Sequence, residues 1–171
     1  MPTTFEMLAG YNSWANARVY KAASDMSDDA YRKDGGAFLG SVHRTLNHLL
    51  VTDRIWMKRF GARDDAPTRL DEILFEDFAE LSAARQAEDA AIENWIGMLT
   101  QADLSGMIRY RRATENTEIA QPLISALVHM FNHQTHHRGQ VHCLMTGIEN
   151  RDFAPALDLL AYQRETGVGM A

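Results

Sequence analysis

The chain has 171 residues and a net charge of -6 at pH 7, and 46% of its residues are hydrophobic. This length predicts a single domain over residues 1–171, and the acidic balance argues against nucleic-acid binding, which usually needs a basic face. The chain has one cysteine, and its start shows no signal-peptide pattern. No apolar run approaches the roughly 18 residues that a membrane span needs. These features predict a complete cytoplasmic protein without a membrane partner.

Two amphipathic helical patterns occupy the first part of the chain. Thr3 followed by Glu6 has the spacing of a capping box, so the first helix is expected to begin near Thr3 and to end near residues 24–25. Ser41 is a favourable N-cap residue and Gly61 a favourable helix terminator. These two residues predict a second helix between them.

The middle of the chain predicts one more helix and then a hairpin. Asp77 and Glu80 form another capping pair, from which the third helix is expected to run to about Leu99. Residues 107–120 show weak alternation around a turn-like stretch at residues 113–116, which predicts a short β-hairpin.

The last part of the chain predicts the longest helix. Pro122 suits its first turn, and we expect it to end at residues 145–146 with Gly147 just beyond. A short C-terminal helix is expected from Pro155 to about Arg164. The fold class is therefore predicted to be all-α, with four long helices, a β-hairpin before the fourth and a short helix at the end.

Histidines are concentrated in the predicted fourth helix, where four of the seven fall at positions 129, 133, 136 and 137. A helix advances about 100° and 1.5 Å per residue, so His129 and His136 are roughly 10 Å apart along the axis, too far to share an ion. On a helical wheel His137 lies inside the apolar arc and His133 at its edge, whereas the other two face solvent. His133 and His137 are therefore the pair predicted to bind a metal, one turn apart on one face.

A third ligand must come from another segment, because two imidazoles hold an ion only loosely. His142 lies on the far side of the fourth helix from His133. On the second helix, His43 is nearer the apolar face and His48 lies at its margin, so the wheel does not choose between them. Asp53, in the middle of that face, is a candidate ligand or a partner of a ligand. Histidines hydrogen-bonded within an ordinary core remain the alternative interpretation.

Several other polar residues also need an interpretation. Gln134 and Arg138 fall within the apolar arc of the fourth helix, where a buried charge or amide is costly unless it is paired. They predict a polar pocket or a subunit contact. Cys143 is expected in the core, and the acidic pair at residues 88–89 is expected at the solvated surface.

Three segments resemble a known family. Residues 132–140, NHQTHHRGQ, resemble the C-terminal signature of the DinB/YfiT-like family of metalloenzymes, the DNA-damage-inducible DinB proteins and not the polymerase. Residues 46–50, LNHLL, followed by Trp56 resemble its second-helix motif. Residues 11–16, YNSWAN, resemble its first-helix motif. The resemblance extends over the whole chain.

The resemblance implies a ligand set and an architecture that spacing alone leaves open. It implies that His48 joins His133 and His137 at a mononuclear metal site. It also implies an up-down-down-up four-helix bundle and a homodimer. Nickel, zinc and ferrous iron all suit imidazole ligands, so the sequence does not select the divalent metal.

The same resemblance implies a metal-dependent enzyme acting on a small molecule. It would be either a thiol-dependent S-transferase or isomerase, using a low-molecular-weight thiol such as mycothiol or bacillithiol, or a hydrolase. No general base is predicted, and Asp53, Asn16, Tyr11 and Arg138 are candidates for contacts with the metal ligands, with the substrate or across a dimer interface. The alternative is a non-catalytic, stress-associated metal-binding protein in which the ion stabilises the bundle.

Overall fold

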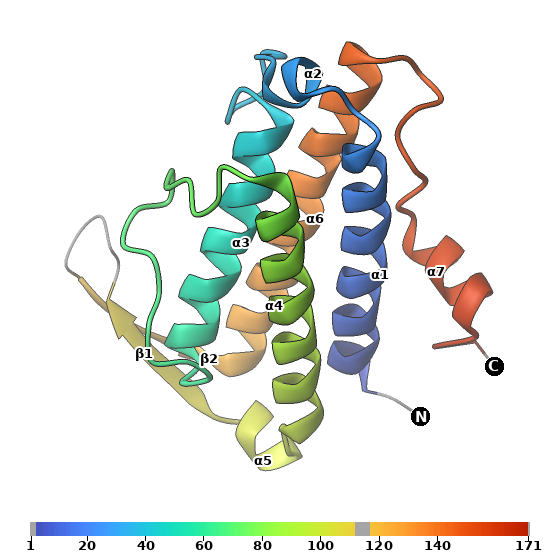
Figure 1. Ribbon diagram of the computed structural model, residues 1–171. Helices are drawn as coiled ribbons and strands as arrows, with labels where there is room; N and C mark the ends of the chain where they lie inside the picture. The colour runs from blue at the N-terminus through green and yellow to red at the C-terminus, as the bar shows by residue number, and fades with distance from the viewer. Residues whose placement is uncertain (1–2, 112–116, 171) are drawn as a thin grey trace.

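Four long helices form most of the molecule, and they lie side by side (Figure 1). The computed structural model describes residues 3–111 and 117–170. The long helices are α1 (Thr4–Ser24), α3 (Val42–Arg59), α4 (Phe78–Met98) and α6 (Leu123–Ile148). The short ones are α2 (Asp28–Arg32), α5 (Gln101–Leu104) and α7 (Leu159–Thr166). The prediction of a mostly helical fold is confirmed.

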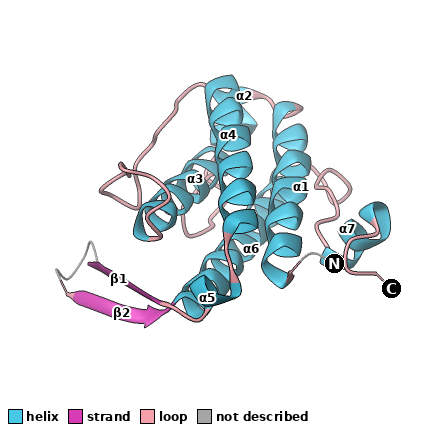
Figure 2. Cartoon of the chain, turned by 90° about the horizontal axis from the view of Figure 1, so that it is seen from below, coloured by secondary structure: helices cyan, strands magenta, loops and turns pink. Residues whose placement is uncertain are grey.

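A small antiparallel sheet precedes α6. Its strands are β1 (Met107–Arg111) and β2 (Glu118–Pro122), with Met107 opposite Pro122 and Arg111 opposite Glu118. This confirms the predicted hairpin, whereas its expected turn at residues 113–116 lies outside the described residues. Figure 2 shows the hairpin projecting from the end of the helices, next to α5.

Each long helix packs against two of the others. α1 contacts α4 and α6, and α3 contacts the same two helices, while α7 lies against the outer side of α1 (Figure 1). The apolar core fills the space between them and has Leu46, Leu81, Leu127 and Met145 among its fully buried side chains. No helix within the described residues combines the length and the apolar character that crossing a membrane requires.

The predicted starts of α1, α3 and α4 are confirmed, and in each of them a local side chain satisfies one of the first backbone N–H groups. Thr3 and Glu6 form the expected capping box. Ser41 Oγ accepts a hydrogen bond of 3.2 Å from the N–H of residue 44. Asp77 Oδ1 accepts one of 2.9 Å from the N–H of residue 80.

Several predicted boundaries are wrong by a few residues. Gly147 lies inside α6, which continues to Ile148 because the packing of the helix overrides the weak glycine signal. Pro122 is the last residue of β2 and the N-cap of α6, one residue before the helix begins. The C-terminal helix begins after Asp158, which caps it, and not at Pro155. The short helices α2 and α5 were not predicted, since so few residues show no helical periodicity.

A layer of buried polar side chains crosses the core and takes residues from all four long helices. Asp53 is its centre: its Oδ2 accepts a hydrogen bond of 2.6 Å from Arg85 Nη1, and its Oδ1 accepts one of 2.9 Å from Gln134 Nε2. We call this set the polar layer, and its members are Asn12, Asn16, Asp53, Arg85, Asp89, Gln134 and Arg138. Through Asp53 the polar layer joins α3 to α4 and α6.

The rest of the polar layer joins α1 to α4 and α6. Asp89 accepts hydrogen bonds from the side-chain amides of Asn12 and Asn16, and Arg138 donates to the amide oxygens of the same two residues. Arg85 Nη2 also lies 2.8 Å from Asp89 Oδ1 as an ion pair, without the alignment of a hydrogen bond. Burial raises the pKa of Asp89, which the charge of Arg85 opposes. Two carboxylates and two guanidinium groups thus share this layer.

The expected surface position of residues 88–89 is wrong. Both side chains are buried, Asp89 in the polar layer and Glu88 beside it. Glu88 Oε2 accepts a hydrogen bond of 2.6 Å from Arg63 Nη1, and Arg54 Nε lies 3.3 Å from the same oxygen. The acids are buried because each has a cationic partner, which offsets much of the cost of removing the charge from water.

The long connection between α3 and α4 is held against α3 by one buried amide. Asn47 Oδ1 accepts hydrogen bonds of 2.9 and 3.0 Å from the N–H groups of Leu74 and Phe75. Its Nδ2 donates to the carbonyl oxygen of Phe75 at 3.1 Å. This attachment places the preceding part of the connection, with Leu70, over the face of α3 that carries His48.

Candidate metal centre

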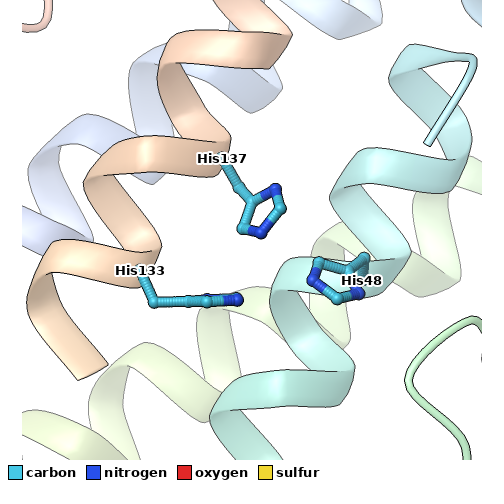
Figure 3. Close-up of side chains that lie close together, drawn as sticks. All are labelled: His48, His133 and His137. Carbon is cyan, nitrogen blue, oxygen red and sulfur yellow. The ribbon is translucent and has the colours of Figure 1, made fainter. Parts of the chain in front are cut away.

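Three histidines from two helices converge in the interior, as Figure 3 shows. His48 comes from α3, and His133 and His137 come from α6. The ring centroids are 4.3 Å apart for His133 and His137, 4.5 Å for His48 and His137, and 5.4 Å for His48 and His133. One ring nitrogen from each residue lies within 4.8 Å of the others.

Hydrogen bonds fix which nitrogen of two of these rings faces the cluster. His48 Nδ1 lies 2.7 Å from the carbonyl oxygen of Leu70, and His137 Nδ1 lies 2.7 Å from Gln140 Oε1. Because both oxygens are acceptors, each Nδ1 carries the hydrogen, and the lone pair is left on Nε2. Histidines that bind metals are commonly oriented by such a bond from the second ring nitrogen.

Burial keeps all three rings neutral. It lowers the pKa of His133 to about 3, and charge repulsion from the neighbouring His137 and His48 contributes to this decrease. It lowers the pKa of His137 to about 4, against the opposing effect of the Gln140 hydrogen bond. It also lowers the pKa of His48, against the hydrogen bond to Leu70. At pH 7 the cluster therefore presents three uncharged imidazoles whose lone pairs can bind a cation without first losing a proton.

The dimensions of the cluster fit one divalent ion. Two nitrogens bound at about 2.1 Å in tetrahedral geometry are roughly 3.4 Å apart. Since the three nitrogens are already within 4.8 Å, the rings need to approach by no more than about 1.4 Å. Among the described residues, no other group of three His, Cys, Asp or Glu side chains brings its ligand atoms this close. The geometry agrees with the predicted ligand set, and metal binding itself stays a prediction.

The other candidate histidines are either exposed, as the helical wheel predicted, or hydrogen-bonded to a backbone carbonyl outside the cluster. His129 and His136 are exposed, as predicted. His43 is as buried as His48, but its Nε2 lies 3.2 Å from the carbonyl oxygen of Phe75, to which it donates. Burial therefore did not distinguish His43 from His48, and the difference lies in what each ring faces.

Other candidate residues belong to the polar layer or to the packing of α7. Asp53 is bound to Arg85 and Gln134 and is not a member of the histidine cluster. Asn16 and Arg138 also lie in the polar layer. Gln134 and Arg138, which predicted a polar pocket or a subunit contact within the apolar arc of α6, bind buried side chains of α1 and α3.

Two further residues lie away from the cluster. Tyr11 donates a hydrogen bond of 2.6 Å to the carbonyl oxygen of Leu157. Cys143 is exposed, so its expected core position is wrong: it lies on the outward side of α6, between the buried Val141 and Leu144.

The orienting groups of the cluster were not predicted. Gln140 lies three residues after His137, a spacing at which helical side chains meet, so the sequence does contain a signal for it. The carbonyl oxygen of Leu70 has no such signal, because its position depends on the path of the whole connection between α3 and α4.

Comparison with known proteins identifies the family of this chain. A match to the DinB family covers residues 1–149, which include all three clustered histidines. The chain is 22% identical over 144 residues to Protein DinB of Bacillus subtilis (strain 168), covering 79% of this chain and 80% of that protein. The crystal structure of a DinB-like protein from Bacillus cereus ATCC 10987 has a similar fold, with a TM-score of 0.59 and 17% identity over 77% of this chain and 84% of the other. Because the family match spans nearly the whole sequence, the chain belongs to the DinB family.

Proposed function

We propose that this chain is a metal-dependent enzyme whose single divalent ion, nickel, zinc or ferrous iron, is held by His48, His133 and His137. The observation that carries the proposal is the convergence of three neutral imidazoles, two of them with the Nδ1 hydrogen already engaged. A bound ion would supply Lewis acidity, which lowers the pKa of a water molecule or thiol that binds it. The substrate would be a small molecule, and the reaction S-transfer from a thiol or hydrolysis.

The donor set favours a catalytic over a structural ion. Structural zinc sites are usually closed by four protein ligands, whereas three neutral imidazoles leave at least one position open. His133 is only half-buried, which gives this side of the cluster access to solvent. The apolar core and the polar layer join the helices through contacts that do not include the cluster, so we expect the fold to persist without an ion.

Two features support the up-down-down-up bundle that the resemblance implied. α1 and α3 each pack against α4 and α6. The connection over residues 60–77 runs back along the molecule in Figure 1, so that α3 and α4 point the same way. The homodimer that the resemblance implied and the cytoplasmic location expected from the sequence remain proposals.

Metal loading tests the proposed centre. Tag-free protein should bind about one equivalent of Ni²⁺ or Zn²⁺ per chain, measured by elemental analysis after dialysis. At a free metal concentration a hundredfold above Kd, binding should raise the unfolding temperature by about 5–10 °C.

Removal of the ion distinguishes a catalytic ion from one that stabilises the bundle. EDTA should abolish any thiol-transfer or hydrolase activity and leave the helical circular dichroism signal unchanged. If EDTA instead unfolds the helices at 25 °C, the ion is structural and the proposal of a catalytic centre is wrong.

The orienting role of Gln140 gives a second prediction. Gln140→Ala removes the acceptor for His137 Nδ1, so the ring loses its fixed orientation, and metal affinity should fall about tenfold or more while the ligand set stays complete. Isothermal titration with Zn²⁺ measures the change. Gln163→Ala, on α7 and far from the cluster, is the matched control and should bind as the unmodified chain does. Equal affinity of both variants would contradict this role.

A further inference from the structure

The connection between α3 and α4 spans residues 60–77 and contains no helix or strand, and the structure describes all of it. A return along the 18 residues of α3 needs about 27 Å, whereas this connection could span about 59 Å if it were fully extended. Connections of this length without secondary structure are uncommon in compact domains and often carry a function. The contacts that it makes along α3 therefore need an explanation beyond the return of the chain.

The second half of this connection, residues 69–75, is attached to α3 near both of its ends, and we call it the strap. The Asn47 amide oxygen accepts hydrogen bonds of 2.9 and 3.0 Å from the last two N–H groups of the strap. Near its other end, the carbonyl oxygen of Leu70 accepts the hydrogen bond of 2.7 Å from His48 Nδ1. Because Asn47 and His48 are adjacent in α3, the two attachments have a fixed separation.

The Asn47 side chain fixes the end of the strap in both position and orientation. It is 0% exposed, so water cannot substitute for its partners. Its oxygen accepts the two bonds from the strap, and its Nδ2 donates at 3.1 Å to the carbonyl oxygens of both His43 and Phe75. These four bonds use the whole hydrogen-bonding capacity of a side-chain amide. A shift of the strap would therefore break several of them together.

The attachment at Leu70 determines which tautomer of His48 is present. A neutral imidazole carries its hydrogen on either nitrogen, and the hydrogen bond of one nitrogen decides which of them can bind a metal. The carbonyl oxygen of Leu70 keeps the hydrogen of His48 on Nδ1, so the lone pair is on Nε2. His137 is oriented by Gln140 of its own helix, whereas His48 depends on a separate segment of the chain.

We propose that Asn47 is a positioning residue of the metal centre, and that the strap and the ion hold each other in place. Asn47 fixes the end of the strap, the strap fixes the Leu70 carbonyl oxygen, and that oxygen keeps the Nε2 lone pair of His48 available. A cation on Nε2 makes Nδ1–H a stronger donor to Leu70, because the hydrogen bond gains charge assistance. Linkage is reciprocal, so an attached strap strengthens ion binding by the same factor. This inference rests on the proposed function, since it concerns the regulation of the same centre.

The tautomer of His48 in the metal-free, full-length chain tests the positioning role without any ion. Imidazole ¹⁵N resonances at pH 7 should show His48 as the Nδ1–H form in the unmodified chain. Asn47→Ala releases the strap, so the Nε2–H form should become populated, and Zn²⁺ affinity measured by isothermal titration should fall about tenfold or more. If Asn47 serves stability alone, the tautomer stays unchanged.

A second variant keeps every hydrogen bond of Asn47 and loosens only the link to His48. Two glycines inserted between Glu72 and Ile73 lengthen the strap between its attachments, at a small cost in loop-closure entropy. The same change of tautomer and the same loss of Zn²⁺ affinity are expected. Two glycines inserted between Asp65 and Ala66, ahead of the strap, are the matched control and should change neither.

Hydrogen exchange tests the reciprocal effect of the ion on the strap. Saturating Zn²⁺ should slow exchange of the amides of residues 74 and 75 in the unmodified chain, and the insertion after Glu72 should remove this effect. An unchanged His48 tautomer in the variant with that insertion, or equal Zn²⁺ affinity of the two insertion variants, overturns the positioning role. If the unmodified chain binds no Zn²⁺, the proposed function and the link between strap and ion are both wrong, and the tautomer still decides the role of Asn47.

Discussion

Asp53→Ala is expected to lower the free energy of unfolding by about 3–5 kcal/mol, a large part of the 5–15 kcal/mol typical of a domain. Asp53 is 1% exposed and accepts hydrogen bonds from both Arg85 and Gln134. Its removal leaves the buried Arg85 guanidinium with only Asp89 to balance it, and leaves the Gln134 amide without its acceptor. Urea unfolding followed by circular dichroism measures the loss.

Two control variants show how much of the expected loss of stability comes from the burial of Asp53 and how much from removing an acidic group. Asp71→Ala removes an acid that pairs with Arg69 in an exposed position, where the change should stay within about 0.5 kcal/mol. Asp53→Asn keeps an acceptor for Gln134 and removes only the charge, so its cost should fall between the other two. If Asp53→Ala is as stable as Asp71→Ala, the polar layer does not hold the helices together as we describe.

The starts of α1, α3 and α4 could be predicted because their determinants are local. Thr3, Ser41 and Asp77 each cap a helix through a bond to a backbone N–H three residues later, a relation that depends on no other segment. The end of α6 could not be predicted in the same way. Gly147 is a favourable terminator in isolation, but tertiary packing carries the helix past it.

The buried charges of α4 were missed for a different reason. This helix is rich in alanine, so its inward face is not distinguished by large apolar residues. The buried positions of α4 recur at helical spacing, and three of them are charged: Leu81, Arg85, Glu88, Asp89, Ile92 and Ile96. A charge pair at i and i+4 is usually solvated, and only partners on α1 and α3 make this one stable when buried.

The histidine cluster was predictable in part. Helical geometry alone identified His133 and His137 as an inward pair, because both lie on one element and their relation is local. The third member depends on how α3 rotates against α6, which the sequence of α3 does not specify, so His43 and His48 were equivalent until the family resemblance favoured His48. In the structure the His43 ring donates to the carbonyl oxygen of Phe75 and the His48 ring faces α6, and its role as a metal ligand stays a prediction.

His137→Ala should abolish stoichiometric metal binding and leave helicity largely intact. His137 is the ring nearest to both of the others, with centroids 4.3 and 4.5 Å away, so its loss leaves two imidazoles on different helices. Two ligands hold an ion only loosely, and we expect affinity for Zn²⁺ or Ni²⁺ to fall at least about a hundredfold. Elemental analysis of tag-free protein and isothermal titration measure the loss.

His136→Ala is the matched control, because it removes a histidine one position away on the same helix. His136 is exposed and stands outside the group of three ligand atoms, so this variant should keep one ion per chain. Its ring contacts the Gln140 amide, and a small change in affinity through that contact is compatible with the assignment. The assignment is wrong if His137→Ala keeps a full equivalent of metal, or if both variants lose it equally, since the ion would then be held by surface imidazoles and not by the interior cluster.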